Sequence, residues 1–327
     1  MSAWLALTAS LAACNSAKGV TGIPVNRTAP VFPKPISRRS ENMLGITYMA
    51  ASMFLFAAVD TQAKYLTSTL HPLQIVWCRQ LGLLFGVFIL LAIRGLSVLH
   101  TQHPWLQIGR GGVAACSATL FIVAVSFVPL ADAVAVAFVA PFIVTVLGAI
   151  LLREPVGLRR WIAVSIGFLG TLIVIRPGFE AFHPALLLVV LAAIFFAMRQ
   201  IVSRILGSTD RTSTTVAYTA LVGSFILTIP LPFVWKWPAT TQEIIILTTM
   251  SAMAALAEFL VIKSLEAAHA VVVAPVQYTL IIWGTMYGFL VFGQLPDFWT
   301  WTGAAIIIAT GFYTLQQERL ATLKPDD

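Results

Sequence analysis

The sequence predicts an all-α membrane protein whose chain crosses the bilayer many times. Hydrophobic residues make up 59% of the chain and charged residues only 10%, against roughly 45–50% and 25% in soluble globular domains. So few charges cannot cover the surface of a water-soluble fold of this length. The chain also contains repeated apolar runs of about 20 residues, the length that a helix needs to cross the hydrocarbon core.

A pattern of landmarks occurs twice along the chain. The first copy starts at Leu130-Ala131-Asp132 and continues through an apolar run to Pro155 and Gly170. The second starts at Ala267-Ala268-His269 and continues to Pro296 and Gly311. The offset is 137 residues at the start and 141 at the later landmarks. The chain is therefore predicted to be an internal duplication.

Apolar runs bounded by Pro, Gly and charged residues predict ten helices, five in each copy. The first five span residues 44–65, 73–93, 105–127, 133–152 and 161–175, and the second five span 184–206, 215–234, 244–265, 271–292 and 299–315. The corresponding domains are a first repeat over 44–176, a second over 184–316 and a cytoplasmic tail over 317–327. Because five is odd, the second copy must enter the membrane from the opposite side. An inverted 5+5 repeat of this kind is typical of secondary transporters that work by alternating access.

Lysine and arginine residues beside the predicted helices favour one side of the membrane. If the first helix begins in the cytoplasm, the far side holds only Lys64, Arg176 and Lys236. The cytoplasmic ends then hold Arg38, Arg39, Arg94, Arg110, Arg153, Arg159, Arg160, Arg199, Arg204, Arg211, Lys263, Arg319 and Lys324. The positive-inside rule therefore predicts a multi-pass protein of the cell inner membrane with both termini in the cytoplasm.

Residues 1–42 differ from the rest of the chain. The stretch Leu11-Ala12-Ala13-Cys14 is similar to a lipoprotein cleavage box, but no positive charge precedes it, as a signal peptide requires. Residues 18–40 are rich in Pro, Ser and Thr, which is typical of a disordered tail. Since Met43 directly precedes the first helix, the alternative is that the start codon is assigned too early.

Composition and spacing exclude several other kinds of site. The net charge of +7 comes from single lysines and arginines at helix ends, so we expect no nucleic-acid partner. The three cysteines, Cys14, Cys78 and Cys116, form no CxxC pair. His100 and His103 have no acid or cysteine at ligand spacing, so we predict neither a metal site nor a cofactor.

Three charged residues lie toward the outer ends of the first two predicted helices. A charge near the bilayer centre costs about 2.5–3.5 kcal/mol on insertion scales, so each such residue needs a reason. Asp60 and Lys64 are four residues apart and share a helix face, where they could pair or form a substrate or proton site. Arg79 has no acid near it in sequence. It could bind an anionic or imide-bearing substrate, or pair with Asp60 across the bundle, and the pair is the reading that we favour.

Glu258 is the deepest acid in the sequence, near the middle of the eighth predicted helix. A buried carboxyl group suits the binding and release of a proton during a transport cycle. A carboxylate held by hydrogen bonds from a neighbouring helix is the alternative. We therefore predict that Glu258 either binds and releases a proton during transport or makes a structural contact with a neighbouring helix.

The ninth predicted helix places polar and aromatic groups after a proline. Gln277, Tyr278 and Trp283 follow Pro275, and Pro141 has the corresponding place in the fourth helix. Each proline removes one helical hydrogen bond and predicts a kink or hinge. The amide and rings could bind a planar metabolite. Packing is the alternative, which we favour for Trp283.

The remaining polar and small residues in the apolar runs have simpler explanations. Arg199 and Gln200 are expected to mark the membrane boundary of the sixth helix. Two GxxxG pairs, one beginning at Gly82 and the other at Gly284, permit close helix contact. Those contacts could lie within one bundle or between the two copies of a homodimer.

The residues around the duplicated landmarks resemble a known family. In the first copy these are Pro129-Leu130-Ala131-Asp132-Ala133, Ala140-Pro141-Phe142, Leu152-Arg153-Glu154-Pro155, Gly167-Phe168-Leu169-Gly170 and Ile175-Arg176-Pro177-Gly178. In the second they are Ala274-Pro275-Val276-Gln277-Tyr278, Trp283 and Phe292-Gly293-Gln294. The pattern looks like the EamA domain of the drug/metabolite transporter superfamily and covers about residues 45–315. Gln294 stands where that family usually has a glutamate, whereas the first copy keeps Glu154.

A narrower resemblance concerns the first two helices. Phe56-Ala57-Ala58-Val59-Asp60, Lys64-Tyr65 and His71-Pro72-Leu73-Gln74 with Arg79 are similar to the proteobacterial riboflavin-transporter branch. The resemblance implies uptake of riboflavin as the leading function. Because related branches export amino acids and other metabolites, export is the alternative.

Two other functional classes fit the sequence less well. A membrane-embedded enzyme would show clustered acids and histidines or a motif such as HExxH, and the sequence has none. A passive channel would not need an inverted duplication. The sequence therefore favours a secondary transporter that moves a small organic molecule across the lipid bilayer.

Overall fold

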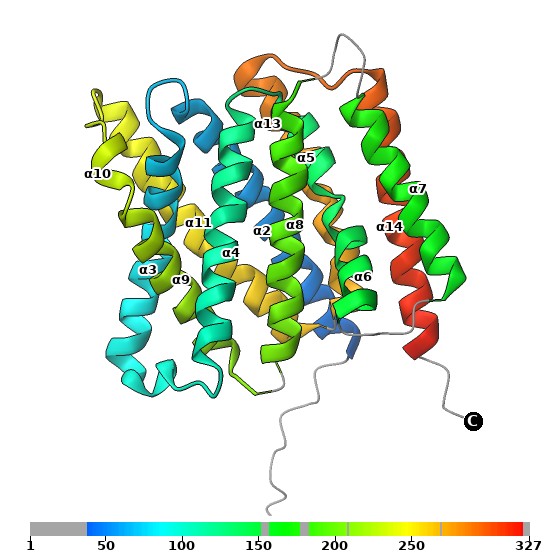
Figure 1. Ribbon diagram of the computed structural model, residues 1–327, viewed down its shortest axis with the longest axis horizontal. Coiled ribbons are helices and arrows are strands. Elements are labelled where there is room, and N and C mark those ends of the chain that lie inside the picture. Colours follow the sequence, from blue (N-terminus) through cyan, green and yellow to red (C-terminus); the bar gives the residue numbers. More distant parts are fainter. Residues whose placement is uncertain (1–37, 152–156, 177–182, 208, 269, 323–327) are drawn as a thin grey trace, which may run out of the picture. The chain divides into compact units, whose positions relative to one another are not determined.

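The computed structural model in Figure 1 describes residues 38–151, 157–176, 183–207, 209–268 and 270–322. Within these residues every regular element is a helix. The predicted tail over 1–42 lies mostly outside them, as do Glu154 and His269.

The helices follow one another with short connections. The first half contains α2 (Arg38–Leu66), α3 (Pro72–Arg94), the 3₁₀ turn η2 (Leu96–Leu99), α4 (Pro104–Val125), α5 (Leu130–Ala137), α6 (Ala140–Leu151) and α7 (Leu158–Ile175). The second half contains α8 (Ala185–Leu206), α9 (Thr212–Thr228), α10 (Leu231–Val234), α11 (Thr241–Ala267), α12 (Ala270–Val273), the 3₁₀ segment η3 (Ala274–Tyr278), α13 (Thr279–Phe292) and α14 (Phe298–Thr322).

Seven helical segments among the described residues are long and apolar enough to cross a membrane. They span 42–66, 72–94, 104–125, 130–151, 185–206, 241–267 and 274–292. In α7 only the fifteen residues from Trp161 to Ile175 form an apolar helix, which is shorter than a full span. The chain is thus a multi-pass helical membrane protein.

The fourth predicted helix, 133–152, is divided into two. Helix α5 ends at Ala137 and α6 begins at Ala140. Pro141 explains the division, because its nitrogen has no hydrogen to donate to the carbonyl of Ala137, four residues earlier. The break therefore lies one turn before the proline that causes it.

The ninth predicted helix, 271–292, is interrupted at the corresponding place. The chain passes from α12 into the 3₁₀ segment η3, which contains Pro275, and then into α13. A shorter break separates α9 from α10, within the predicted helix 215–234 and next to Pro230. Helix α14 continues to Thr322, so the tail predicted from residue 317 begins inside a helix.

The helices of the two halves pack on one another in matching pairs. Helix α2 packs on α11, and α8, its counterpart in the second half, packs on α4, the counterpart of α11. The contacts of α3 with α11 and of α9 with α4 form a second such pair. Equivalent helices also meet directly, as α3 does with α9 and α7 with α14, which lie side by side in Figure 1. These contacts therefore come in equivalent pairs, in which the first and second halves of the chain have reversed roles.

Close packing of α3 on α11 depends on the absence of a side chain at Gly82. A Cβ atom on Gly82 would overlap the main-chain carbonyl group of Ser251 in α11. Gly86, one turn further along the same helix, has nothing within 4 Å of the corresponding position. The first GxxxG pair thus contributes one contact inside the bundle, through Gly82.

We expect Gly82→Ala to lower the melting temperature of the detergent-solubilised protein and Gly86→Ala to leave it unchanged or raise it. The added methyl group at 82 meets backbone, which cannot move aside, and overpacking of this kind costs about 1–3 kcal/mol. Both variants gain the same helix propensity, so a thermal melt isolates the packing effect. Equal melting temperatures for the two variants would contradict this account of the α3–α11 contact.

Candidate functional site: charged residues inside the bundle

A buried ion pair joins α2 and α3. The Arg79 Nη1 atom donates a hydrogen bond to Asp60 Oδ1 at 3.2 Å, and the Asp60 side chain is 9% exposed. The Arg79 guanidinium also lies 5.9 Å from the centre of the Phe56 ring, one helical turn from Asp60. The pairing of Arg79 with Asp60, the reading favoured from the sequence, is what the structure shows.

Lys64 has other partners, and the pair with Asp60, one of the two alternatives that the sequence left open, is not formed. The Lys64 Nζ atom donates to the carbonyl oxygen of Val128 at 2.6 Å and to Gln294 Oε1 at 3.0 Å. Asp60 is already occupied by Arg79, so the ammonium group turns toward the end of α2. Gln294, the residue that differs from the usual family glutamate, is thus one of its acceptors.

Two further arginines, Arg110 and Arg199, lie close to each other inside the bundle. Arg110 in α4 donates to Ser203 Oγ at 2.7 Å, and to the Thr219 hydroxyl and the Thr215 carbonyl of α9. Arg199 in α8 lies 4.7 Å from the centre of the Phe196 ring. It lies about two turns before the end of α8, with its Nε atom buried. Its place at the membrane boundary stays a prediction.

Glu258 in α11 lies among these arginines. Its carboxylate attracts the guanidinium groups of Arg110 and Arg199, while Arg79 repels Arg199. In the described part of the chain Glu258 forms no ion pair within 4 Å, and Lys263 pairs with Glu266 instead. We call Asp60, Arg79, Arg110, Arg199 and Glu258 the interior charge cluster.

Gln277, Tyr278 and Trp283 occupy different surroundings from the cluster. Gln277 is exposed. Tyr278 is buried, with its ring stacked between Phe138 at 4.9 Å and Phe312 at 5.7 Å. In this conformation both faces of the Tyr278 ring are covered by protein.

Trp283 packs on the side of α2 away from Asp60. Its ring meets Phe54 edge-on at 5.1 Å between centroids, and its indole nitrogen is buried with no hydrogen-bond partner among the described residues. Phe54 and Asp60 differ by about 240° around the helix axis, at 100° per residue. Trp283 and the ion pair therefore lie on different faces of α2.

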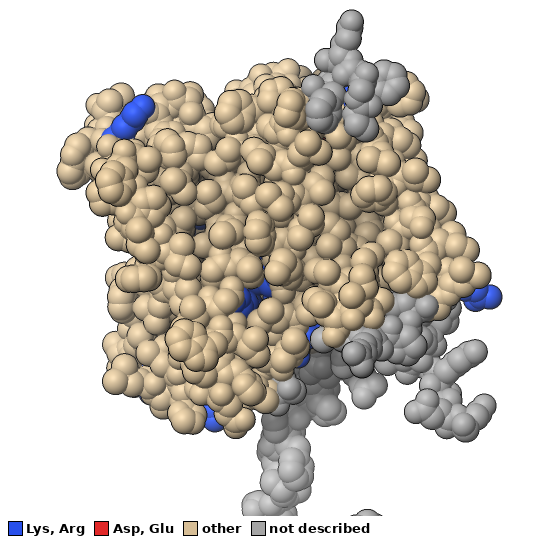
Figure 2. All heavy atoms as spheres, in the orientation of Figure 1, with Lys and Arg blue, Asp and Glu red and all other residues tan. Residues whose placement is uncertain are grey.

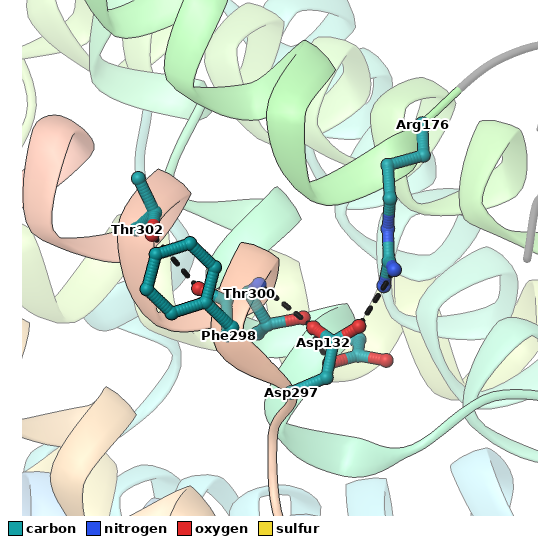
Figure 3. A network of polar contacts seen from close by, with 6 residues as sticks. All are labelled: Asp132, Arg176, Asp297, Phe298, Thr300 and Thr302. Carbon is teal, nitrogen blue, oxygen red and sulfur yellow. Dashed lines mark hydrogen bonds and ion pairs between the residues drawn. The ribbon is translucent and has the colours of Figure 1, made fainter.

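A second group of charged residues forms the network of polar contacts drawn in Figure 3. Arg176, at the end of α7, pairs with Asp297 Oδ2 at 2.6 Å. Asp297 Oδ1 accepts from the amide of Thr300 at 2.9 Å, which caps α14, and the Thr300 hydroxyl donates to Asp132 Oδ1 at 2.9 Å. We call Asp132, Arg176, Asp297 and Thr300 the Asp297 network. It joins α5, α7 and α14.

One face of the molecule is apolar. Figure 2 shows one face that is almost wholly uncharged, with lysine or arginine atoms at its edges and inside a hollow near its middle. Such a surface suits contact with lipid, and charges withdrawn below it are expected to face the interior of a membrane bundle.

Charges held between packed apolar helices are typical of a membrane transport protein more than of an enzyme. The comparison with known proteins agrees. The model of the EamA-like transporter family matches residues 43–176 and again 183–315, so the chain belongs to the EamA-like transporter family. It is a member of the drug/metabolite transporter superfamily and not an enzyme.

Curated relatives align with most of the chain. An S-adenosylmethionine uptake transporter of Rickettsia bellii is 28% identical, over 86% of this chain and 96% of its own length. A riboflavin transporter of Vibrio cholerae is 30% identical over the same shares. A pseudopaline exporter of Pseudomonas aeruginosa is 24% identical over 81% of this chain and 93% of its own.

A solved crystal structure shares the fold. It covers 87% of this chain and 99% of its own, with a TM-score of 0.59 and 18% sequence identity. At this identity the likeness concerns the arrangement of the helices alone.

We expect Asp60→Asn to destabilise the protein by about 3 kcal/mol, because it leaves the Arg79 guanidinium buried without its counter-ion. The double variant Asp60→Asn with Arg79→Gln should recover much of this loss. Thermal melts of the wild type, both single variants and the double variant give the coupling energy. Additive effects of the two substitutions would contradict a direct ion pair.

The Asp297 network should depend on pH. Burial acts to raise the pKa of Asp297, but the hydrogen bonds from Thr300 and the charge of Arg176 outweigh it and hold the pKa below its ordinary value. A lowered folded-state pKa adds stability above about pH 4, and this stability is lost as pH falls through the folded-state value.

Asp297→Asn should therefore lower the melting temperature at pH 7, and its difference from the wild type should shrink as pH falls from 4 toward 3. Because the Asp297 side chain is 45% exposed, the difference should stay below about 1 kcal/mol. Melting curves across this pH range measure it. A gap between the two proteins that persists unchanged at pH 3 would show that Asp297 contributes through its shape and not its charge.

Proposed function

We propose that this protein is a secondary transporter that takes up riboflavin across the cell inner membrane by alternating access. The observation that carries the proposal is the interior charge cluster. Its residues lie on helices that pack in matching pairs across the two halves, in a chain that belongs to the EamA-like transporter family. Charges placed inside a membrane bundle are retained where they meet a substrate or an ion.

The proposed topology is ten crossings in an inverted 5+5 repeat, with domains over 44–176 and 184–316. Three observations support it: the symmetric pairing of the helices, the equivalent breaks at Pro141 and Pro275, and the family match to each half. In this topology both termini lie in the cytoplasm, and the Asp297 network closes the outer end. The breaks at the two prolines would serve as hinges.

Riboflavin is favoured by relatives and by the groups available to bind it. Riboflavin transporters of Vibrio cholerae, Rhizobium johnstonii and Brucella anthropi are 30%, 24% and 27% identical to this chain. The flavin ring is planar and carries carbonyl and imide groups, which suit the guanidinium donors of Arg79 and Arg199. In the proposed site Gln277, Tyr278 and Trp283 would contact the substrate only in another conformation, because Tyr278 is covered in this one.

Uptake of S-adenosylmethionine is the second candidate. Four relatives with this named function are 24–28% identical to the chain. The carboxylate of Glu258, which has no ion-pair partner within 4 Å in the described part of the chain, could face a cationic group. Export of an amino-acid-like metabolite, suggested by the pseudopaline exporter, is a third possibility with the transport direction reversed.

Growth of a riboflavin-auxotrophic bacterium tests the proposal. Cells that express the full chain should grow on low riboflavin, whereas cells with the empty vector should not. Uptake of labelled S-adenosylmethionine by the same cells tests the second candidate. Absence of growth from protein shown to be in the membrane would refute riboflavin uptake.

Glu258→Gln should lower uptake several-fold while the amount of protein in the membrane stays normal, because Gln cannot carry a proton. Glu266→Gln is the control: Glu266 lies on the same helix, is exposed and, in the described part of the chain, pairs with Lys263. Initial rates of uptake at two external pH values distinguish a loss of proton coupling from a loss of substrate binding. A Glu258→Gln protein with the full rate and the pH dependence of the wild type would remove Glu258 from the mechanism.

A further inference from the structure

The interior charge cluster and the Asp297 network differ in their balance of positive and negative charges. Lys64, near the end of α2, attracts Asp132 of the network, so Lys64 and Arg176 equal Asp132 and Asp297 in number. The interior charge cluster contains three guanidinium groups and two carboxylates, and among the described residues it holds one positive charge in excess.

Arg199 carries the excess positive charge. Arg79 is paired with Asp60, and Arg110 donates hydrogen bonds to Ser203, Thr215 and Thr219. The Arg199 Nε atom is buried and has no hydrogen-bond partner in the described part of the chain. A buried donor without a partner is rare in native structures and needs an explanation.

The surroundings of Arg199 prepare it to bind an acceptor. Stacking on Phe196 fixes the plane of the guanidinium group. Arg79 repels it from one side and Glu258 attracts it from another without forming a close ion pair. The group is thus held in place while its donors stay available, and a planar pair of oxygen atoms is the arrangement that a guanidinium binds best.

We propose that Arg199 binds an acidic planar group of the transported molecule, a carboxylate or an imide, and that Glu258 is the counter-ion which this group displaces. The inference builds on the proposed transport function and narrows its substrate class. A flavin ring would supply the imide, and an amino-acid-like metabolite would supply the carboxylate.

Small probes test the binding group without any transport assay. The melting temperature of the detergent-purified full chain is measured with benzoate or its neutral isostere benzamide, and with succinimide or N-methylsuccinimide. A ligand that binds the folded state raises the melting temperature. We expect benzoate or succinimide to raise it by a few degrees more than the neutral or methylated counterpart.

Substitutions then show whether Arg199 causes the difference in melting temperature between the paired probes. Arg199→Gln should abolish the difference between the paired probes, and Arg199→Lys, which keeps the charge and loses the planar donor pair, should weaken it. Arg204→Gln is the matched control, because Arg204 is exposed on the same helix and its loss changes the net charge equally. The melting temperatures without probes show whether each variant is folded.

The outcomes decide between the alternatives. A preference for benzoate identifies the carboxylate source, and a preference for succinimide identifies the imide. Equal effects of both members of each pair on the wild type, or a preference that survives in Arg199→Gln, would overturn the proposal. Failure of riboflavin uptake in cells would not change these melts, so the two proposals fail separately.

Discussion

The ion pair between Arg79 and Asp60 sets the positions of the other charges in the bundle. Asp60 is buried and its ion-pair partner among the described residues is Arg79. Because Arg79 takes that place, Lys64 turns outward and finds Val128 and Gln294. Arg110 and Arg199 are left to share the carboxylate of Glu258. In a medium that screens charge poorly, one contact thus determines where the excess charge resides.

The duplication explains the scaffold, and its differences explain the chemistry. Helix pairs and breaks recur in both halves because both derive from one pattern of apolar runs and prolines. The charged side chains do not recur in that way. Asp60 and Arg79 belong to the first half, whereas Arg199 and Glu258 belong to the second. The bundle is therefore nearly symmetric in its backbone and asymmetric in its electrostatics.

Much of the fold follows from the sequence, since hydrophobic runs and turn residues are local signals. The Arg79–Asp60 pair also follows from the sequence, because a buried arginine needs an acidic partner and the apolar runs contain few acidic residues. The breaks were placed at Pro141 and Pro275, but the first lies a turn earlier, where the carbonyl loses its donor. The sequence places Arg199 near the end of a helix, but it does not show what surrounds the side chain. Its neighbours, Arg79 and Glu258, are far away in sequence, and only packing brings them together.

The stack of Phe138 on Tyr278 brings the two interrupted helices into contact at their interruptions. Phe138 follows the last residue of α5, and Tyr278 closes η3. Each interrupted segment is thus part of the surface on which the other rests. If the proposed hinges move and one segment straightens, the ring that it carries must slide across its counterpart or leave it. In the proposed transport cycle the two halves would then bend together, because a rearrangement begun in one would be transmitted to the other through a pair of aromatic rings.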